Sequence, residues 1–292
     1  MPELPEIEHL RRTLAKRIVG ATVDSVDVRR ADVVRTPRGR GGRQAVDALS
    51  ALRRARVTST ARHGKQLAVV TSRGVVVVHL GMSGRLLSID EDAPTCAALA
   101  AERHVHVTMT MVDDDARRSL LIHSDPRRFG GLWVHASLEE ARAQRWSKLG
   151  PDALTIGHDR FIDVLGRRRR ALKALLLDQS ILAGVGNIYA DEALHRAGLH
   201  PRSRAATIPR QRLEALHTAL RHVLRDAVDA GGSTIRDYQD ATGRFGTYAL
   251  LHRVYGRGGS PCLACGTTLR ASIVGGRTTV HCPRCQRSAT PR

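Results

Sequence analysis

The opening stretch MPELPE holds two residues, Pro2 and Glu3, whose types could do chemistry together. If Met1 is removed, Pro2 carries a free secondary amine that can attack an electrophilic carbon, and the neighbouring Glu3 carboxyl can transfer a proton. The same stretch also suits a helix start, because proline is tolerated in the first turn and acidic side chains interact favourably with the helix dipole. The two interpretations are compatible.

Four cysteines stand in two Cys-x2-Cys pairs: Cys262 with Cys265, and sixteen residues further on Cys282 with Cys285. This spacing is typical of a zinc site with four thiolate ligands. A closed shell of four cysteines leaves no open position on the metal, so we expect one structural Zn²⁺. Disulfides are the weaker alternative in a cytosolic protein. The fifth cysteine, Cys96, belongs to no such motif.

The segment between the two cysteine pairs, TTLRASIVGGRTTVH, predicts a β-hairpin that turns at Gly275 and Gly276. Arg277 follows the turn directly and is therefore expected near the tip. A guanidinium group on a rigid hairpin suits contact with phosphate. The alternative is an arginine that is merely solvated.

The chain carries 47 basic and 28 acidic residues, a formal net charge of +19. Such an excess favours a polyanionic partner, although an arginine-rich proteome would also produce it. Arginine does not give up its proton, so proton transfer needs another residue. Lys65, which follows a glycine at the start of a predicted strand, is one of only four lysines; the others are Lys16, Lys148 and Lys173.

The chain has no apolar run of 18 residues, and its N-terminus lacks the apolar core of a signal peptide. We therefore expect a cytoplasmic protein with no membrane partner. The nine aromatic side chains are too few for a platform on which single-stranded bases stack, which favours duplex nucleic acid as the partner.

Hydrophobic periodicity outlines the elements that must position these residues. Residues 5–19 predict an amphipathic helix ended by Gly20, and β-branched runs predict strands from about residue 21 to 134. Loops are expected at 37–43, which is basic, and at 90–103.

Helical patterns follow from residue 137 onward, and the last forty residues become rich in glycine, cysteine and strand formers. This layout predicts three domains: a β domain (1–136), a helical domain (137–250) and a small zinc module (251–292). The predicted helices lie within 137–150, 158–168, 171–178, 187–198 and 209–230.

Several motifs resemble those of bacterial formamidopyrimidine-DNA glycosylase, and they occur in the same order. The resemblance extends over the whole chain. The motifs are PELPEIE at 2–8, HLGMSG at 79–84, DPRRFG at 125–130, GVGNIYADEAL at 184–194, and VYGR at 254–257 with the four cysteines. The resemblance implies a multidomain α+β fold: an N-terminal β-sandwich with flanking helices, a helix-two-turns-helix domain and a C-terminal zinc-finger hairpin. It also implies a bifunctional glycosylase and lyase of base excision repair. Such an enzyme removes 8-oxoguanine and formamidopyrimidines from duplex DNA and nicks the strand by β,δ-elimination.

The resemblance also assigns catalytic roles by position. Pro2 matches the nucleophile that forms a Schiff base, and Glu3 matches the proton donor. Lys65 matches the lysine that donates a proton in β-elimination. Arg277 matches the finger arginine given a role in δ-elimination, where phosphate binding or charge stabilisation suits an arginine better than acid chemistry.

Further positions match residues that contact DNA in this family. Met82 and Phe129 match the wedge that fills the space of an extruded nucleotide, and Arg127 matches the residue that faces the orphaned base. Asn187 begins a predicted helix where it could hold a phosphate, or act as a plain N-cap. His104 and Arg168, the latter within the run 167–170, match other DNA-contact regions.

The resemblance implies as partner double-stranded DNA with oxidised bases or abasic sites, and a monomer acting at the bacterial nucleoid. Two alternatives stay open. An endonuclease VIII-like enzyme would prefer oxidised pyrimidines, although that branch typically carries glycine at the position of Leu4 and the wedge motif favours the purine branch. A noncatalytic zinc-ribbon protein would bind DNA without cleaving it. Residues 241–257 match the lesion-capping region only loosely.

Overall fold

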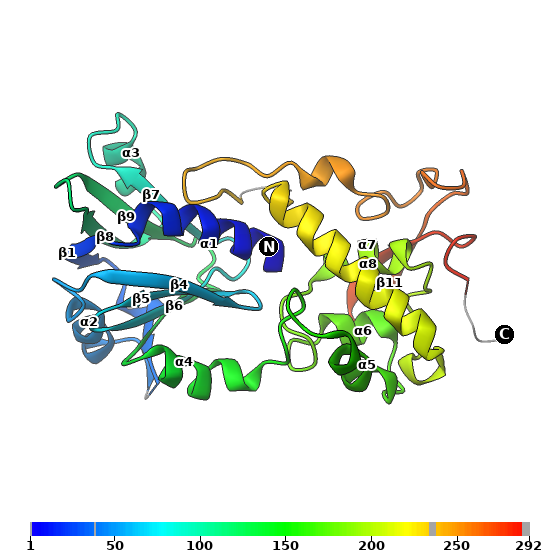
Figure 1. Ribbon diagram of the computed structural model, residues 1–292. Coiled ribbons are helices and arrows are strands. Elements are labelled where there is room, and N and C mark those ends of the chain that lie inside the picture. Colours follow the sequence, from blue (N-terminus) through cyan, green and yellow to red (C-terminus); the bar gives the residue numbers. More distant parts are fainter. Residues whose placement is uncertain (1, 38, 234–237, 288–292) are drawn as a thin grey trace. The chain divides into compact units, whose positions relative to one another are not determined.

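The computed structural model describes residues 2–37, 39–233 and 238–287 (Figure 1). The chain divides into two compact units, Met1–Ser147 with Gly231–Gly246, and Lys148–Ala230 with Thr247–Arg292. The expected mixture of a strand-rich N-terminal part, a helical part and a C-terminal hairpin beside a cysteine cluster is confirmed. The division into three domains at residues 136 and 250 stays a prediction.

The first unit is a β-sandwich of two sheets, and its strands, which run from Thr22 to His135, lie in the region where the sequence predicts strands. All neighbouring strands are antiparallel except β2 and β10, which are parallel. One sheet has the order β1 (Thr22–Val28), β8 (Val105–Val112), β9 (Arg118–Ser124), β7 (Arg85–Asp90). The other has the order β3 (Gly39–Arg40), β2 (Val34–Thr36), β10 (Gly131–His135), β6 (Gly74–His79), β5 (Gln66–Thr71), β4 (Val57–His63).

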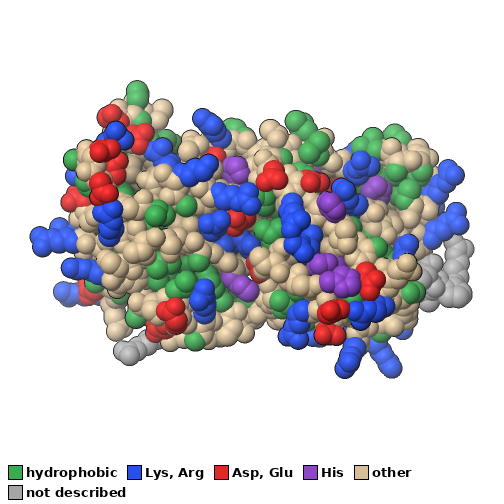
Figure 2. Space-filling model, in the orientation of Figure 1, with side chains coloured by type: hydrophobic (Ala, Val, Ile, Leu, Met, Phe, Trp, Pro, Cys, Tyr) green, Lys and Arg blue, Asp and Glu red, His purple; other side chains and the backbone are tan. Residues whose placement is uncertain are grey.

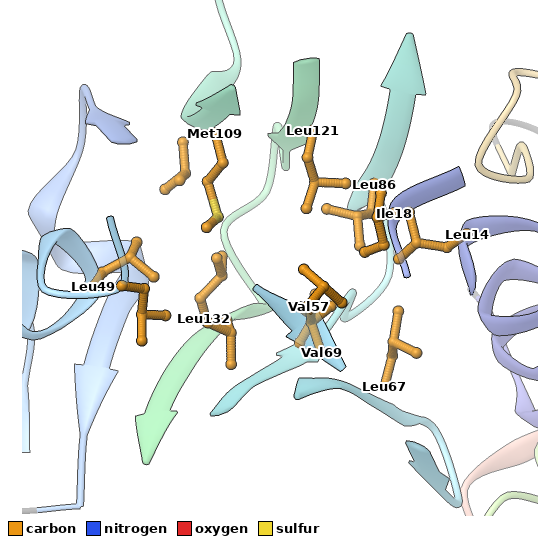
Figure 3. Close-up of a cluster of buried hydrophobic side chains, with 14 of the residues drawn as sticks. Leu14, Ile18, Leu49, Val57, Leu67, Val69, Leu86, Met109, Leu121 and Leu132 are labelled. Atoms are coloured by element: carbon orange, nitrogen blue, oxygen red, sulfur yellow. The ribbon is translucent and has the colours of Figure 1, made fainter. Parts of the chain in front are cut away.

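Two helices close the open sides of this sandwich. Helix α1 (Leu4–Ile18) packs against β4 and β7, the edge strands of the two sheets, and α2 (Arg43–Ser50) packs against β1 and β2 on the other side. Helix α4 (Leu138–Gln144), which is capped by Ser137, lies against β6 and β10. Figure 3 shows how side chains of both sheets and of α1 and α2 meet in one apolar core, represented by Leu14, Leu49, Val69, Met109, Leu121 and Leu132.

Two segments expected as loops contain regular structure. The 90–103 segment holds a short helix, α3 (Cys96–Ala100), because its run of alanine and leucine has high helix propensity and its first residue, Cys96, is buried. The 37–43 segment holds strand β3, whose main chain pairs with β2, and the first residue of α2. Both expectations were therefore wrong in part.

The second unit is helical, and its helices lie where the periodicity predicted them. They are α5 (His158–Gly166), α6 (Leu172–Leu177), α7 (Asn187–Arg196) and α8 (Arg210–Asp229), with 3-10 turns at Ala205–Thr207 and Tyr248–Leu251. A further 3-10 turn, Trp146–Lys148, spans the boundary between the two units in the sequence. Helix α7 is buried along nearly its whole length, because α6, α8 and a strand of the C-terminal hairpin pack around it. That hairpin comprises β11 (Arg270–Val274) and β12 (Arg277–His281). Within the described part of the chain, none of the helices has the length and apolar character needed to cross a bilayer.

A buried histidine in the sandwich makes the stability of the first unit depend on pH. His123 in β9 is 1% exposed, burial lowers its pKa to about 4, and among the described residues neither ring nitrogen has a hydrogen-bond partner. Between pH 6.5 and about 4, the His123 ring is protonated in the unfolded chain but stays neutral in the folded protein. Acidification through this window therefore lowers the free energy of unfolding, by about 3 kcal/mol for this one site.

We predict that His123→Leu removes most of this loss. The free energy of unfolding is measured by urea titration at pH about 7 and about 4.5, with tryptophan fluorescence as the probe. Both tryptophans, Trp133 and Trp146, lie in the first unit. The exposed His222→Leu is the control and should keep the wild-type pH dependence. An unchanged loss in His123→Leu would contradict the assignment.

Candidate functional site

The first turn of α1 holds the N-terminal residues in a buried, hydrogen-bonded arrangement. Glu3 is the N-cap, and it forms a reciprocal capping box with Glu6, whose Oε2 accepts the Glu3 backbone N–H at 2.8 Å. Both side chains are almost fully buried, at 2% and 1% exposure, and Pro2 is buried as well. The helix-start interpretation of MPELPE is confirmed, and it places Pro2 and Glu3 on a fixed backbone.

Glu6 also ties α1 to a distant segment of the first unit. Its Oε1 accepts the Ser233 N–H at 2.6 Å, and its backbone carbonyl accepts the Tyr238 hydroxyl at 2.7 Å. Burial raises the Tyr238 pKa well above its ordinary value, so the phenol stays protonated and donates. A Cβ on Gly232, which has φ +84°, would lie 2.8 Å from the Glu6 carboxylate, so this position requires glycine.

Lys65 lies in the two-residue turn between β4 and β5, with Gly64 at φ +55°. Arg62, at the end of β4, donates to the Gly64 carbonyl at 3.0 Å and to Glu8 on α1 at 3.0 Å. Burial alone would raise the Glu8 pKa, but the surrounding arginines lower it to about 2. A nearly buried ion pair therefore holds the turn that carries Lys65 against the helix that begins at the N-terminal residues.

Lys65 is one of several basic side chains whose charges act on His79. His79, the last residue of β6, has its pKa lowered to about 4 by burial, then by the charges of Arg145, Lys65 and Arg35. The two arginines stack on the ring of Trp133, with their Cζ atoms 3.4 Å (Arg145) and 4.5 Å (Arg35) from its centroid. His79 lies within the quoted HLGMSG motif, whereas nothing local distinguished these two arginines among the many in the chain.

Figure 2 shows basic side chains spread over the visible face of the molecule, with acidic side chains gathered in smaller groups among them. This distribution matches the net charge of +19. A surface of this kind attracts polyanions over distances of about a Debye length, roughly 8–10 Å at physiological salt.

The HLGMSG and DPRRFG segments interlock through Asp125. Its Oδ1 accepts the Ser83 hydroxyl at 2.7 Å, and its Oδ2 accepts the Gly130 N–H at 2.9 Å. A Cβ on Gly81, which has φ +60°, would approach the Gly130 nitrogen to 2.6 Å, so the two turns touch at their backbones. Residues distant in sequence are thereby presented side by side.

The predicted wedge residues project from these interlocked turns. Met82 is 40% exposed and Phe129 is 56% exposed, and the Arg127 guanidinium stacks on the Phe129 ring at 4.5 Å. His104 precedes β8, and its carbonyl accepts the Asp125 N–H at 3.1 Å, so its backbone adjoins the same turn. The two turns, held together by Asp125, thus present Met82 and Phe129 to solvent, as a wedge that inserts into a partner requires.

In the second unit, Asn187 and Arg277 lie on elements that are bonded to each other. Asn187 is the first residue of α7, whose N-cap is Gly186, so the plain N-cap alternative for Asn187 is wrong. Its side-chain amide donates to the Thr278 carbonyl at 3.0 Å. Arg277 is exposed and pairs with Val274 across the predicted glycine turn, near the tip of the hairpin.

A buried ion pair holds this hairpin on the helices. Lys173 of α6 and Asp191 of α7 approach to 2.7 Å, at 0% and 2% exposure. The Lys173 ammonium also donates to the Thr278 carbonyl at 3.0 Å and to the Thr279 hydroxyl at 2.8 Å. Asp191 Oδ2 accepts the Val280 N–H at 3.0 Å. The ion pair thus binds three consecutive residues of β12, directly after Arg277.

Arg168 lies apart from these contacts. It is exposed in the run that follows α5, and its Nε donates to the Val164 carbonyl at 2.8 Å. The structure therefore leaves its guanidinium accessible at the end of a helix, with most of its donors directed to solvent or to a partner.

The four predicted cysteines come together in the C-terminal module. One sulfur atom from each of Cys262, Cys265, Cys282 and Cys285 lies within 4.8 Å of the others, with Cys265 and Cys282 sulfurs 3.5 Å apart. Tetrahedral zinc with bonds of about 2.3 Å needs sulfur atoms about 3.8 Å apart, so the donor set fits this ion. A metal ion bound there would stabilise the C-terminal module, whose own hydrophobic core is small.

Family models match most of the chain. Residues 1–132 match the Formamidopyrimidine-DNA glycosylase N-terminal domain, and residues 149–239 match the Formamidopyrimidine-DNA glycosylase H2TH domain. Relatives with the name formamidopyrimidine-DNA glycosylase extend the match to the whole chain. Those of Bacillus subtilis and Thermomicrobium roseum are 37% and 41% identical, with 98% of this chain and 99% of each relative covered.

Solved structures agree with the sequence matches. A complex of the Lactococcus lactis Fpg with abasic-site DNA superposes with a TM-score of 0.84 at 31% identity, covering 98% of this chain and all of that one. A point mutant of that protein, in complex with Fapy-dG DNA, gives 0.85 at 31% identity and the same coverage. Fold and comparisons define a DNA glycosylase of base excision repair. The chain belongs to the formamidopyrimidine-DNA glycosylase family, and neither alternative raised by the sequence is favoured.

We predict that Lys173→Met lowers the free energy of unfolding by about 3–5 kcal/mol, because it leaves the Asp191 charge buried without its ammonium partner. Adding Asp191→Asn to this variant removes that charge and should recover part of the loss. Urea titration followed by helical circular dichroism measures both variants. A double variant less stable than Lys173→Met would show that the buried charge is not the cause.

Proposed function

We propose that this DNA glycosylase removes oxidised purines, 8-oxoguanine and formamidopyrimidines, from duplex DNA and nicks the strand by β,δ-elimination. Support comes from the family, and from the Lactococcus lactis structures, which hold DNA with an abasic site or Fapy-dG. The observation that carries the proposal is the buried capping box, which fixes Pro2 and Glu3 at the start of α1. The enzyme is proposed to act as a monomer at the bacterial nucleoid.

Pro2 would act as the nucleophile once Met1 is removed. An α-amino group titrates at about 7.7–8.0, and the positive end of α1 disfavours its ammonium form, so a reactive neutral amine is present near neutral pH. Its lone pair forms a bond to C1′ as the bond from C1′ to the base breaks, and the amine then loses its N–H proton. The C1′–O4′ bond of the sugar ring breaks next. The departing base and O4′ each take up one proton, one of them donated by Glu3 and the other released by the amine. The product is an iminium linked to the opened sugar.

The iminium would then drive strand cleavage. It acidifies the C2′ hydrogen, and loss of that proton expels the 3′ phosphate in β-elimination. A second elimination expels the 5′ phosphate. Lys65 can transfer protons in these steps because it is an amine held close to α1. Arg277 is suited to hold the departing phosphate charge, since a guanidinium keeps its proton.

DNA binding would combine a wedge with phosphate contacts. Met82 and Phe129 are proposed to fill the space left by the extruded nucleotide, with Arg127 facing the unpaired base. Asn187, His104 and Arg168 are proposed to contact the backbone. We further propose that the four cysteines hold one structural Zn²⁺, which stabilises the module that presents Arg277.

We predict that blocking the Pro2 nitrogen abolishes the chemistry but not binding. A form with a short peptide fused ahead of Pro2 should give no covalent complex when mixed with abasic-site DNA and borohydride. Its base-excision rate should fall on the order of a thousandfold or more, because an amide nitrogen cannot form the iminium. Gel-shift affinity for the same duplex should stay near that of the free form.

The matched control is the same fusion after protease cleavage that regenerates a free Pro2. This form should recover both trapping and excision. Trapping that persists in the blocked form would overturn the proline assignment, and loss of binding together with trapping would point to a damaged fold instead.

We predict that Arg168→Gln weakens binding to undamaged and damaged duplexes alike. Each phosphate contact contributes about −0.9 to the slope of log affinity against log salt, so losing one should make the slope shallower by about 0.9. Fluorescence anisotropy over a range of salt concentrations measures this slope. The exposed Arg225→Gln on α8 is the control for loss of charge alone. Equal slopes in the two variants would remove Arg168 from the phosphate contacts.

A further inference from the structure

One histidine outside the C-terminal module contacts its cysteine cluster. His195, in the last turn of α7, places Nε2 3.6 Å from the sulfur of Cys262. Both residues are buried, at 7% and 3% exposure, and they are 67 positions apart in sequence. The four-cysteine motif gives no indication of this contact, because the histidine comes from a different part of the fold.

The surroundings of the imidazole determine which nitrogen carries the proton. Among the described residues, Nδ1 of His195 is buried and has no hydrogen-bond partner. A proton on Nδ1 would therefore be left without an acceptor, whereas a proton on Nε2 points at the Cys262 sulfur. A thiolate bound to a metal is a good acceptor for such an N–H group.

Two of the other cysteines, Cys265 and Cys282, obtain donors from within the module. The Cys285 N–H lies 3.4 Å from the sulfur of Cys282, and Thr267 donates to the sulfur of Cys265. Four thiolates around one Zn²⁺ carry a net charge of −2, and N–H donors that reach the sulfurs spread that charge. For Cys262, the donor on α7 comes from outside the module.

We infer that His195 is an outer donor to the zinc site, giving an Nε2–H···S hydrogen bond to the Cys262 thiolate that slows loss of the metal. This inference rests on the proposal that the four cysteines hold zinc. The hydrogen bond from His195 would connect the metal site to α7, whose Asn187 and Asp191 hold the hairpin that carries Arg277. The same helix also accepts the backbone N–H groups of Arg253, Val254 and Tyr255 through Glu192.

The test compares zinc release from the full-length protein and its variants. His195→Phe keeps a ring of similar shape but has no N–H, and His195→Gln keeps an amide N–H close to the position of Nε2. With a chromogenic chelator in excess, His195→Phe should release zinc about tenfold faster or more, and His195→Gln should stay near the wild-type rate. In cobalt-substituted protein, the sulfur-to-metal charge-transfer band of His195→Phe should move to longer wavelength, because the thiolate loses a hydrogen bond.

His217→Phe controls for looser packing in the same unit. His217 is also buried, but its Nε2 contacts the Ile156 carbonyl at 3.0 Å and not a cysteine. Equal zinc release from wild type and His195→Phe would overturn the inference, as would fast release from His195→Gln or from His217→Phe to the same extent. Metal analysis of the purified wild type comes first: absence of zinc would overturn the zinc proposal itself, and this inference with it.

Discussion

The buried carboxylate of Glu6 is the constraint on which the candidate chemistry of the first unit depends. A chain terminus normally frays, and a frayed terminus cannot hold an amine at a defined distance from a carbon atom. Here the Glu6 carboxylate accepts the N–H of Glu3 on one side and the N–H of Ser233 on the other. A buried carboxylate is costly unless it is hydrogen-bonded, so it holds both partners firmly. The first turn of α1 is thereby fixed to a segment more than two hundred residues away.

Buried carboxylates also accept backbone N–H groups in the second unit. Glu192 of α7 is 3% exposed, and its carboxylate accepts three successive backbone N–H groups of residues 253–255. Its neighbour Asp191 accepts the Val280 N–H while paired with Lys173. A segment with little regular structure of its own is held in this way by acidic side chains of a helix. In each unit, therefore, buried carboxylates hold backbone segments in place through their N–H groups.

Much of this arrangement could be predicted from sequence, because the signals are local. The period of Ile7, Leu10 and Leu14 gave α1, and the Cys-x2-Cys spacing gave the sulfur cluster. The basic cluster around His79, which includes Lys65, could not be predicted, since it depends on which strands become neighbours: Arg35 lies on β2, while His79 is on β6. The order β2-β10-β6-β5 follows from long-range pairing. Helix α3 was missed for another reason, because five successive apolar residues, CAALA, are too few to show a helical period.

The scarcity of lysine becomes informative once the contacts are known. Arginine serves most basic positions here, yet Lys173 is fully buried. Its ammonium has three N–H donors, and the site offers three acceptors at 2.7–3.0 Å: a carboxylate, a hydroxyl and a carbonyl oxygen. A guanidinium would bring five donors on a wider planar group, and the extra donors would be buried unsatisfied. The number and geometry of donors, rather than the charge, therefore determine the residue at this position.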